Sequence, residues 1–372
     1  MYYRDLLVAD DKTISNNGTT TIDMDGSHMV NAIKMFLRVT GTSNMQADVL
    51  TTIIEHLTKV TLIGDSDHEL ISLTGDELAA LWFYDQHAIP DTQRVAYGNK
   101  SNWVQLNLNF GEFFKDARFG VDFSKWRNII LSLTFDDFST VFQSTTMTAR
   151  VSKVLMEDMS GKPKNYLRKI ELNDSKPSAA NQEVNYTVAE KMKLRRLLFL
   201  IDADLSSSTN VPTNYPTTDS NEFTFTLKDG SIKLYDKAQI KSIWREQVAR
   251  YGHVLSHGRF GLNTSNAIDS LCGYVESAVS SPVEEGSGAD TTLVSWGDEN
   301  SRYQKPKFAG TSDHSATMFR GSGFMSSWPI EFDYAGIQGY LDTSAKGLVQ
   351  SKWKPTTADH AFRLVKDELM TN

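Results

Sequence analysis

The strongest constraint on the fold is a helix-start pattern that occurs twice. Residues 74–77 (TGDE) have the form of a capping box, whose hydroxyl and carboxylate can accept hydrogen bonds from free N–H groups at a helix start. Residues 236–239 (DKAQ) place an N-cap residue and an amide at the same spacing, 162 residues later. Apolar residues follow each pattern at i, i+3 and i+4, namely Leu78, Leu81 and Trp82, then Ile240, Ile243 and Trp244. The sequence therefore predicts two short helices in equivalent places, beginning at Thr74 and Asp236.

Other segments repeat at nearly the same spacing. A predicted β-hairpin precedes each helix, at residues 59–73 and 222–235. Two further pairs of β-like segments lie 163 to 164 residues apart: residues 29–39 with 194–201, aligned on Phe36 and Phe199, and residues 19–24 with 183–188. This agreement over several elements predicts one module that is encoded twice.

The spacing grows toward the end of the chain. Residues 149–154 loosely resemble residues 361–366, which lie 212 positions later, so the second copy is expected to carry an insertion of about 50 residues. We place this insertion at about 251–311, where Gly, Ser, Asn and Glu are frequent. The predicted organisation is a first module at 15–165, a linker at 166–181 and a second module at 182–372.

Strand-like alternation dominates the rest of the sequence. Residues 103–110 (WVQLNLNF) place Val, Leu, Leu and Phe on one face and Gln, Asn and Asn on the other, as in a strand with one face in water. Residues 129–135 alternate in the same way. Each module is long enough for its own core, so the pattern predicts an all-β protein of two β-sandwiches.

Composition excludes several classes of protein. A net charge of −8 and the lack of a Lys/Arg-rich tail argue against direct binding of nucleic acid, because phosphates are neutralised by clustered basic residues. The single Cys272 excludes an intramolecular disulfide and a multi-cysteine metal centre, and is expected to be a small buried residue. The first residues lack the pattern of a secretory signal, and no apolar run approaches the roughly 20 residues of a spanning helix. We expect a soluble chain that is not exported through a signal.

No group of residues predicts catalysis, so we expect no enzyme activity, no catalytic residue and no cofactor. His253 and His257 stand at i, i+4, but glycines flank them, and a solvated loop or helix end is favoured over a metal site. Two Asp-x-Asp triplets resemble calcium loops without their Gly and Glu: Asp65 with Asp67, and Asp202 with Asp204. Acidic turns are favoured for both, and the question of a metal stays open.

The density of aromatic residues between positions 103 and 126 allows two interpretations. A sugar- or base-stacking platform needs such residues, but so does the core of a sandwich, which strand alternation favours. The residues concerned are Trp103, Phe110, Phe113, Phe114, Phe119, Phe123 and Trp126. Four carboxylates are eligible for glycoside chemistry without forming a recognisable pair: Glu112, Asp116, Asp122 and Asp136.

Two β-sandwich modules in tandem, each with a short helix after a hairpin, resemble the double jelly-roll major capsid proteins of tailless icosahedral viruses. The resemblance covers about Gly18 to Lys366 and rests on the repeated strands, the two helices, and the closing strands near Val151 and Leu364. It implies an all-β fold of two tandem jelly-roll sandwiches with short flanking helices. It also implies a homotrimer with six-fold pseudo-symmetry that tiles an icosahedral shell.

The same resemblance implies the partners and the location. Expected partners are neighbouring capsomers, minor capsid or spike proteins and, in many relatives, an inner lipid membrane, with segments 2–8 and 362–369 as candidate inner-face contacts. The protein would be part of the virion and would be assembled in the host cytoplasm. Two other functions remain open: a two-domain carbohydrate-binding or carbohydrate-cleaving β-sandwich protein, and a virion spike or adhesin.

Overall fold

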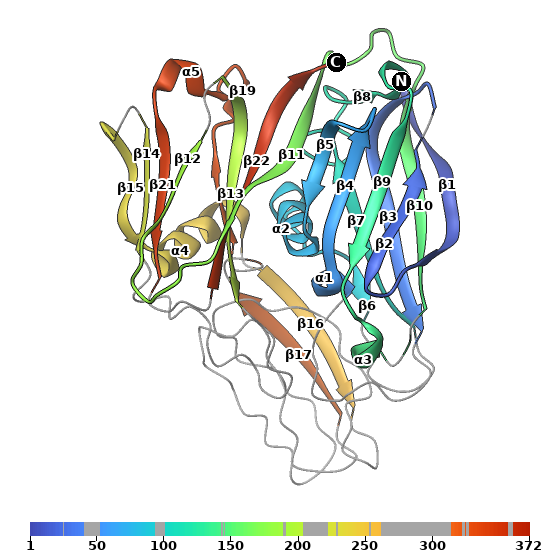
Figure 1. Cartoon of the computed structure of the whole chain (residues 1–372), viewed down its shortest axis with the longest axis horizontal. Helices are drawn as coiled ribbons and strands as arrows, with labels where there is room; N and C mark the ends of the chain where they lie inside the picture. Colours follow the sequence, from blue (N-terminus) through green and yellow to red (C-terminus); the bar gives the residue numbers. More distant parts are fainter. Residues whose placement is uncertain are drawn as a thin grey trace.

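The computed structural model describes residues 1–24, 26–40, 53–93, 101–142, 144, 146–188, 191–203, 222–227, 230–252, 254–261, 314–321, 324, 327–355 and 360–372. Strands account for most of them, and two β-sandwiches stand side by side along the longest axis (Figure 1). The all-β prediction is confirmed.

The first sandwich is a jelly roll of two facing sheets. One sheet has the order β1 (Tyr2–Ile14), β10 (Met147–Glu157), β3 (Met29–Thr40), β7 (Ser101–Asn109), β6 (Thr92–Gln93), and β8 (Val121–Asp122) pairs with β3. The facing strands have the order β2 (Gly18–Asp23), β9 (Ile129–Phe135), β4 (Leu57–Gly64), β5 (His68–Leu73). Alternating apolar side chains of both sheets meet in one core, as the pattern in residues 129–135 predicts.

The second sandwich repeats this strand order. One sheet contains β11 (Asn165–Ser175), β22 (His360–Thr371), β13 (Lys193–Ala203), β18 (Ser327–Glu331), with β20 (Leu341–Asp342) also on β13. The other contains β12 (Val184–Val188), β21 (Val349–Lys354), β14 (Glu222–Leu227), β15 (Ile232–Gln239). Strand for strand, β11 corresponds to β1, β22 to β10, β13 to β3 and β15 to β5. The chain is therefore a tandem of two jelly rolls.

The irregularities of the strands repeat as well. The register of β1 on β10 shifts between Leu7 and Ala9, and that of β11 on β22 shifts between Glu171 and Asn173, which are 164 positions later. The pairing of each hairpin also passes over one leucine, Leu70 in the first and Leu234 in the second, again 164 apart. Because a β-bulge is a specific local feature, its recurrence at one spacing supports duplication.

The predicted alignment of Phe36 with Phe199 is wrong by a single residue. Phe36 lies on the outer face of β3, whereas Phe199 is fully buried in the second core. Met35 pairs with Val151 and Phe199 pairs with Leu364, so the structural counterpart of Phe199 is Met35, at the common spacing of 164. A shift of one residue exchanges the two faces of a strand, and only the partner strand decides between them.

The two principal helices start differently. Helix α2 (Gly75–Gln86) has the predicted capping box, with the Thr74 hydroxyl and the Glu77 carboxylate each accepting a backbone N–H of the other residue. Helix α4 (Ile240–Tyr251) begins four residues later than predicted and has no side-chain cap, because Asp236 belongs to β15. The predicted buried face of α4 is correct for all three residues, and that of α2 for Leu78 and Leu81, whereas Trp82 is only partly buried.

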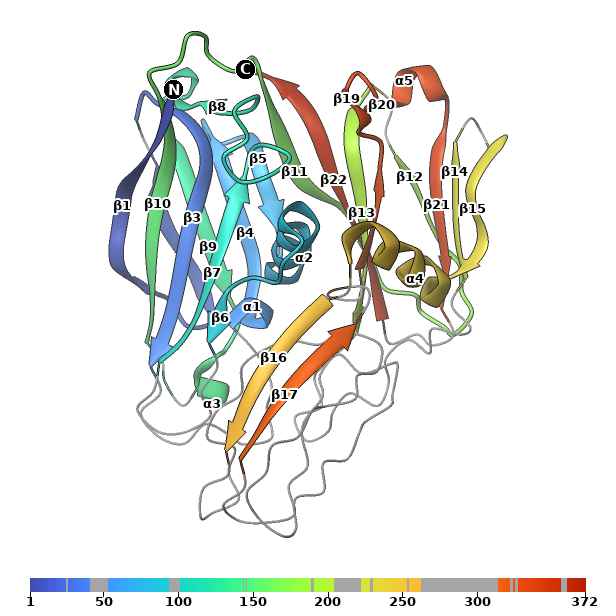
Figure 2. The ribbon, with the colours of Figure 1, turned by 180° about the vertical axis from the view of Figure 1, so that it is seen from behind.

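The remaining elements are short. They are α1 (Ile53–His56), η1 (Phe123–Lys125), α3 (Ser139–Phe142), β19 (Tyr334–Ile337) and α5 (Thr343–Lys346). A separate ribbon of β16 (Val254–Gly261) and β17 (His314–Gly321) extends away from the two rolls (Figure 2). It contains the first part of the predicted insertion at 251–311, and residues 262–313 lie outside the described residues.

The predicted ends of the modules need correction. The predicted linker 166–181 is mostly strand β11, and the first strand, β1, precedes the predicted start at residue 15. Both strands are rich in charged residues, so alternation does not reveal them. They form because a neighbouring strand supplies the backbone hydrogen-bond partners.

The far face of β7 also differs from the prediction. Asn107 and Asn109 are buried rather than in contact with water. The alternation correctly gives the core side of β7, where Val104, Leu106 and Leu108 are fully buried. The alternation carries no information about what covers the face of β7 that bears Asn107 and Asn109.

Candidate functional site at the junction of the two rolls

The two rolls are joined strand to strand. β11 pairs in parallel with β5, Lys169 opposite Ile71 and Ile170 opposite Ser72. This contact merges four strands of the first roll and five of the second into one continuous sheet, visible between the rolls in Figure 1. The relative position of the rolls is therefore set by backbone pairing as well as by side chains.

A buried group of charges lies beside this contact. Asp85, near the end of α2, lies 3.5 Å from Lys169, 3.1 Å from Arg195 and 2.8 Å from Arg196. Asp367 in β22 lies 3.0 to 3.3 Å from the same three cations. The side chains of all five residues are at most 6% exposed. One residue of the first roll and four of the second thus form a single ionic cluster.

A bulge brings two neighbouring arginines to the same side of β13. The pairing of β13 with β22 passes from Leu194 directly to Arg196, which leaves Arg195 as the extra residue. In a regular strand, consecutive side chains point to opposite faces, whereas a bulge can redirect one of them. Both guanidinium groups consequently reach Asp85 and Asp367.

The cluster continues toward α4. Glu331 in β18 lies 3.6 Å from Arg196, Asp333 lies 3.3 Å from Arg195, and Arg250 of α4 pairs with both acids. Four acidic and four basic side chains therefore balance. Balance matters because an unpaired charge in a buried environment is strongly destabilising.

The protonation of the cluster follows from this arrangement. Burial raises the pKa of Asp367, but the charges of Lys169, Arg196 and Arg195 outweigh burial and hold the pKa at about 2. Burial lowers the pKa of Arg195 and Arg196, and the surrounding carboxylates outweigh it and raise both above the usual value. Asp367, Arg195 and Arg196 therefore stay charged over the physiological range, and their ion pairs link the two rolls.

Aromatic contacts extend the junction. The Tyr84 hydroxyl of α2 donates a hydrogen bond to the Ser327 carbonyl of β18 at 2.8 Å. The Tyr84 ring lies 4.9 Å from the Tyr251 ring, and the Phe83 ring lies 5.3 Å from the Phe324 ring. The first core also includes Leu198, Leu200 and Val365 of the second roll. Helix α2 therefore packs against side chains of the second roll, and the first core extends to them.

The cap of α2 lies at the same junction. Glu77 is fully buried, and burial together with the charge of Glu171 raises its pKa to about 8. The Thr74 backbone N–H donates to Glu77 at 2.8 Å and opposes this rise. Arg363 of β22 donates to the Thr74 hydroxyl at 3.2 Å, so the second roll contacts the helix cap of the first.

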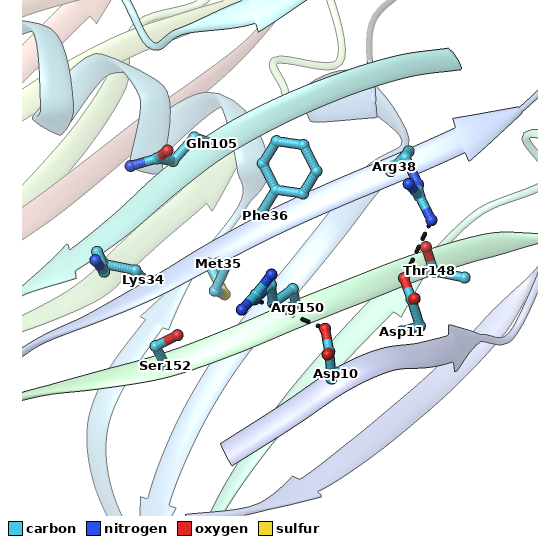
Figure 3. Close-up of a pocket in the computed structure, with 10 residues that line it drawn as sticks. All are labelled: Asp10, Asp11, Lys34, Met35, Phe36, Arg38, Gln105, Thr148, Arg150 and Ser152. Atoms are coloured by element: carbon cyan, nitrogen blue, oxygen red, sulfur yellow. Dashed lines mark hydrogen bonds and ion pairs between the residues drawn. The ribbon is translucent and has the colours of Figure 1, made fainter. Parts of the chain in front are cut away.

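A shallow groove of about 440 Å³ lies on the outer face of the first roll (Figure 3). Lys34, Phe36 and Arg38 project into it from β3, while Met35 points toward the core. Two ion pairs, Arg38 with Asp11 and Arg150 with Asp10, cross from β3 and β10 to β1. The groove is polar and its charges are already paired, which suits a contact surface better than catalysis.

Most metal candidates from the sequence fall outside the described residues. These are His253 and Asp204, together with the side chains of His257 and Asp202. Cys272, which we expect to be buried, also lies outside the described residues. Asp65 accepts hydrogen bonds from the backbone of Arg127 and Asn128 at 2.7 and 3.2 Å, as in an acidic turn. Among the described residues, no three His, Cys, Asp or Glu side chains form a metal-binding group.

Three of the seven residues of the predicted aromatic platform belong to the interior, namely Phe110, Phe119 and Phe123. Trp103, Phe114 and Trp126 are half-buried, and Phe113 is exposed. Trp103 packs beside Phe36 with ring centres 5.4 Å apart. The core interpretation therefore holds for the three buried residues.

Each of the four candidate carboxylates contacts a basic side chain, and Glu112 and Asp116 share one. Arg118 pairs with Glu112 and Asp116. Asp122 pairs with Lys162 at 3.0 Å, and Asp136 contacts His56 at 2.6 Å. The structure does not combine them into an acid–base pair.

Sequence reasoning missed the ionic cluster. A signal was present, because Arg195 and Arg196 interrupt an otherwise apolar strand and residues 366–368 (KDE) interrupt another. Consecutive charges within a buried strand need partners of opposite sign. Which residues would supply them could not be read from the sequence.

No helix among the described residues has both the length and the hydropathy needed to cross a bilayer.

Comparison with known proteins gives the fold. No family model and no curated protein matches the chain. A chain of the Sulfolobus Turreted Icosahedral Virus structure matches with a TM-score of 0.60 and 12% identity, covering 99% of this chain and 90% of that one. A second match is the PBCV-1 protein VP54, with a TM-score of 0.58, 8% identity, and coverage of 99% and 93%. The major capsid protein P2 from bacteriophage PM2 matches with a TM-score of 0.51, 7% identity, and coverage of 100% and 97%. The chain has the double jelly-roll fold of these proteins over nearly its whole length.

Proposed function

We propose that this chain is the structural major capsid protein of an icosahedral virus and that three copies form a pseudo-hexameric building block of the shell. The observation that carries the proposal is the pair of jelly rolls with one strand order, joined edge to edge by β5 and β11. The matched structures of icosahedral viruses support it.

The geometry suits tiling for a physical reason. Two similar rolls in each chain give three chains six similar units around one axis, so that a trimer can occupy a six-fold position. The contact between copies joins different surfaces, and such heterologous contacts form closed rings when their rotation closes. The ionic cluster around Asp85 supports this role, because it fixes one roll relative to the other within each chain.

The proposal includes partners and location. Neighbouring capsomers, minor capsid or spike proteins and an inner lipid membrane are the expected partners, and the protein acts in the virion after assembly in the host cytoplasm. A net charge of −8 fits contacts with protein and lipid rather than with the genome. The function is structural and needs no catalytic site. We assign β1–β10 to the first roll and β11–β22 to the second.

The test is the assembly state of the purified full chain. Sedimentation at micromolar concentration should give a species of three times the 41.7 kDa chain mass, and electron microscopy should show six similar lobes around its axis. A strictly monomeric protein with glycan-dependent binding would instead support the carbohydrate-binding alternative.

A further inference from the structure

In the part of the chain that the structure describes, β1 and β15 are edge strands with a paired neighbour on one side. β1 ends its sheet beside β10, and β15 ends its sheet beside β14. They lie at opposite ends of the molecule (Figure 1). Their structural counterparts are β11 and β5, the two strands that pair with each other at the internal junction. The chain therefore contains one contact of this kind, between β5 and β11, and exposes the two equivalent edges, β15 and β1, at its ends.

The burial of equivalent residues differs accordingly. Tyr166 in β11 is 2% exposed, whereas Tyr2, its counterpart in β1, is 56% exposed. Leu70 in β5 is fully buried, whereas Leu234, its counterpart in β15, is 47% exposed. Equivalent positions are thus apolar in both copies, but only the copy at the junction is covered.

Exposed large apolar side chains concentrate at these ends. Among the described residues, the large apolar side chains that are exposed are those of Met1, Tyr2, Leu7, Phe113, Ile232 and Leu234. All except Phe113 belong to β1, to β15 or to the residue before β1. Exposed edge strands with apolar side chains bind another strand unless something covers them.

The charges of the two edges are also complementary. β1 carries three aspartates against one arginine and one lysine, and β15 carries two lysines against one aspartate. Opposite net charges favour the encounter of unlike edges and oppose the pairing of two identical ones.

We propose that β15 of one copy of this chain pairs in parallel with β1 of the next copy, in the register of the internal β5–β11 contact. Shifting that register by 164 places Tyr235 opposite Asp5 and Asp236 opposite Leu6. This inference rests on the proposed function and deepens it by naming the surfaces that join the copies. Each copy contributes one edge of each kind, so a closed ring leaves neither edge exposed.

Disulfide trapping tests the register directly. Paired residues of adjacent strands lie about 4.8 Å apart, within the range that a disulfide spans. The full-length double variant Asp5→Cys/Tyr235→Cys should convert under mild oxidation into chains linked between copies, mostly closed trimers on a non-reducing gel. The out-of-register variant Asp5→Cys/Ile232→Cys should give at least tenfold less product. Each single variant retains Cys272 and controls for links made through it.

A second experiment tests the apolar contact. Leu234→Asp should raise the concentration at which trimers dissociate by at least tenfold in sedimentation. Phe113→Asp, which changes an equally exposed apolar residue outside both edge strands, should leave it unchanged. Thermal unfolding of both variants checks that the fold is intact.

The outcomes separate the inference from the proposed function. A trimer that shows no Asp5–Tyr235 link and tolerates Leu234→Asp would overturn the edge contact and leave the capsid proposal standing. A chain that remains monomeric in every preparation would overturn both.

Discussion

The two rolls share their strand order and several bulge positions but have different cores. The first core is mostly aliphatic, with residues such as Val60, Leu62 and Leu131. The second is built on stacked rings, with Phe199 packed 5.7 Å from Trp328 and Phe362 5.2 Å from Trp353. One topology thus accommodates two kinds of packing, because alternation and turns set the strand order while the choice of apolar residue sets how the space is filled.

The same strand can also play different roles in the two rolls. β1 is an exposed edge, whereas β11 lies between two strands and carries a lysine into the buried ionic cluster. Duplication followed by contact between the copies explains this difference, since only one of the two equivalent edges is covered inside the chain.

The largest effect is expected from comparing the two cores at one equivalent position. Phe199→Ala should destabilise the protein by about 3 to 5 kcal/mol, because it removes a ring that contacts four other aromatic residues. Met35→Ala, the counterpart in the first roll, should cost less, about 2 to 3 kcal/mol. Urea unfolding measures both, and equal losses would show that the two cores do not differ in this way.

The ionic junction should be nearly as sensitive. Asp85→Ala leaves Arg195, Arg196 and Lys169 with too little negative charge in a buried environment, and should destabilise the protein by about 3 kcal/mol. Asp10→Ala is the matched control, because its pair with Arg150 is exposed, and it should change stability by less than about 0.5 kcal/mol. A loss below about 1 kcal/mol for Asp85→Ala would contradict a junction that depends on these charges.

The pH dependence of stability should report the buried cap carboxylate. The folded pKa of Glu77 is about 8, above its ordinary 4.5, so the folded protein holds a proton that the unfolded chain releases. The stabilisation from this group is complete below pH 4.5 and is lost as the pH rises toward 8. The free energy of unfolding, measured with urea, should fall less between pH 5 and pH 8 in Glu77→Gln than in the wild type.

The control for this experiment is Glu69→Gln, which changes an exposed glutamate of β5. It should retain the wild-type difference between the two pH values. An unchanged difference in Glu77→Gln would mean that other groups cause the pH dependence.

The smallest effect concerns the starts of the two helices. Thr74→Ala removes the hydroxyl that caps α2 and should cost about 1 kcal/mol. Gln239→Ala at the start of α4 should cost less than about 0.3 kcal/mol, because Gln239 makes no side-chain cap hydrogen bond. Similar losses of stability in the two variants, measured by thermal unfolding, would contradict a difference between the two helix starts.

The sequence alone was sufficient for the β-rich class, the duplication and the location of most strands. Alternation in residues 129–135 predicted β9, and the box at Thr74 predicted the cap of α2. These features are local, because a pleated strand and a helix start impose their pattern on neighbouring residues. The resemblance to double jelly-roll capsid proteins followed from their order along the chain.

Only the tertiary structure decided which polar segments are strands and where the charges meet. The sequence predicts a linker in place of β11 because its own residues show no alternation, and its pairing partners lie about 100 residues before it and 200 after it. Arg195 and Arg196 share one side of β13 because the partner strand imposes a bulge. Such features depend on segments that are remote in the sequence, and the physical reason is that hydrogen-bonding partners and counter-charges are supplied across space.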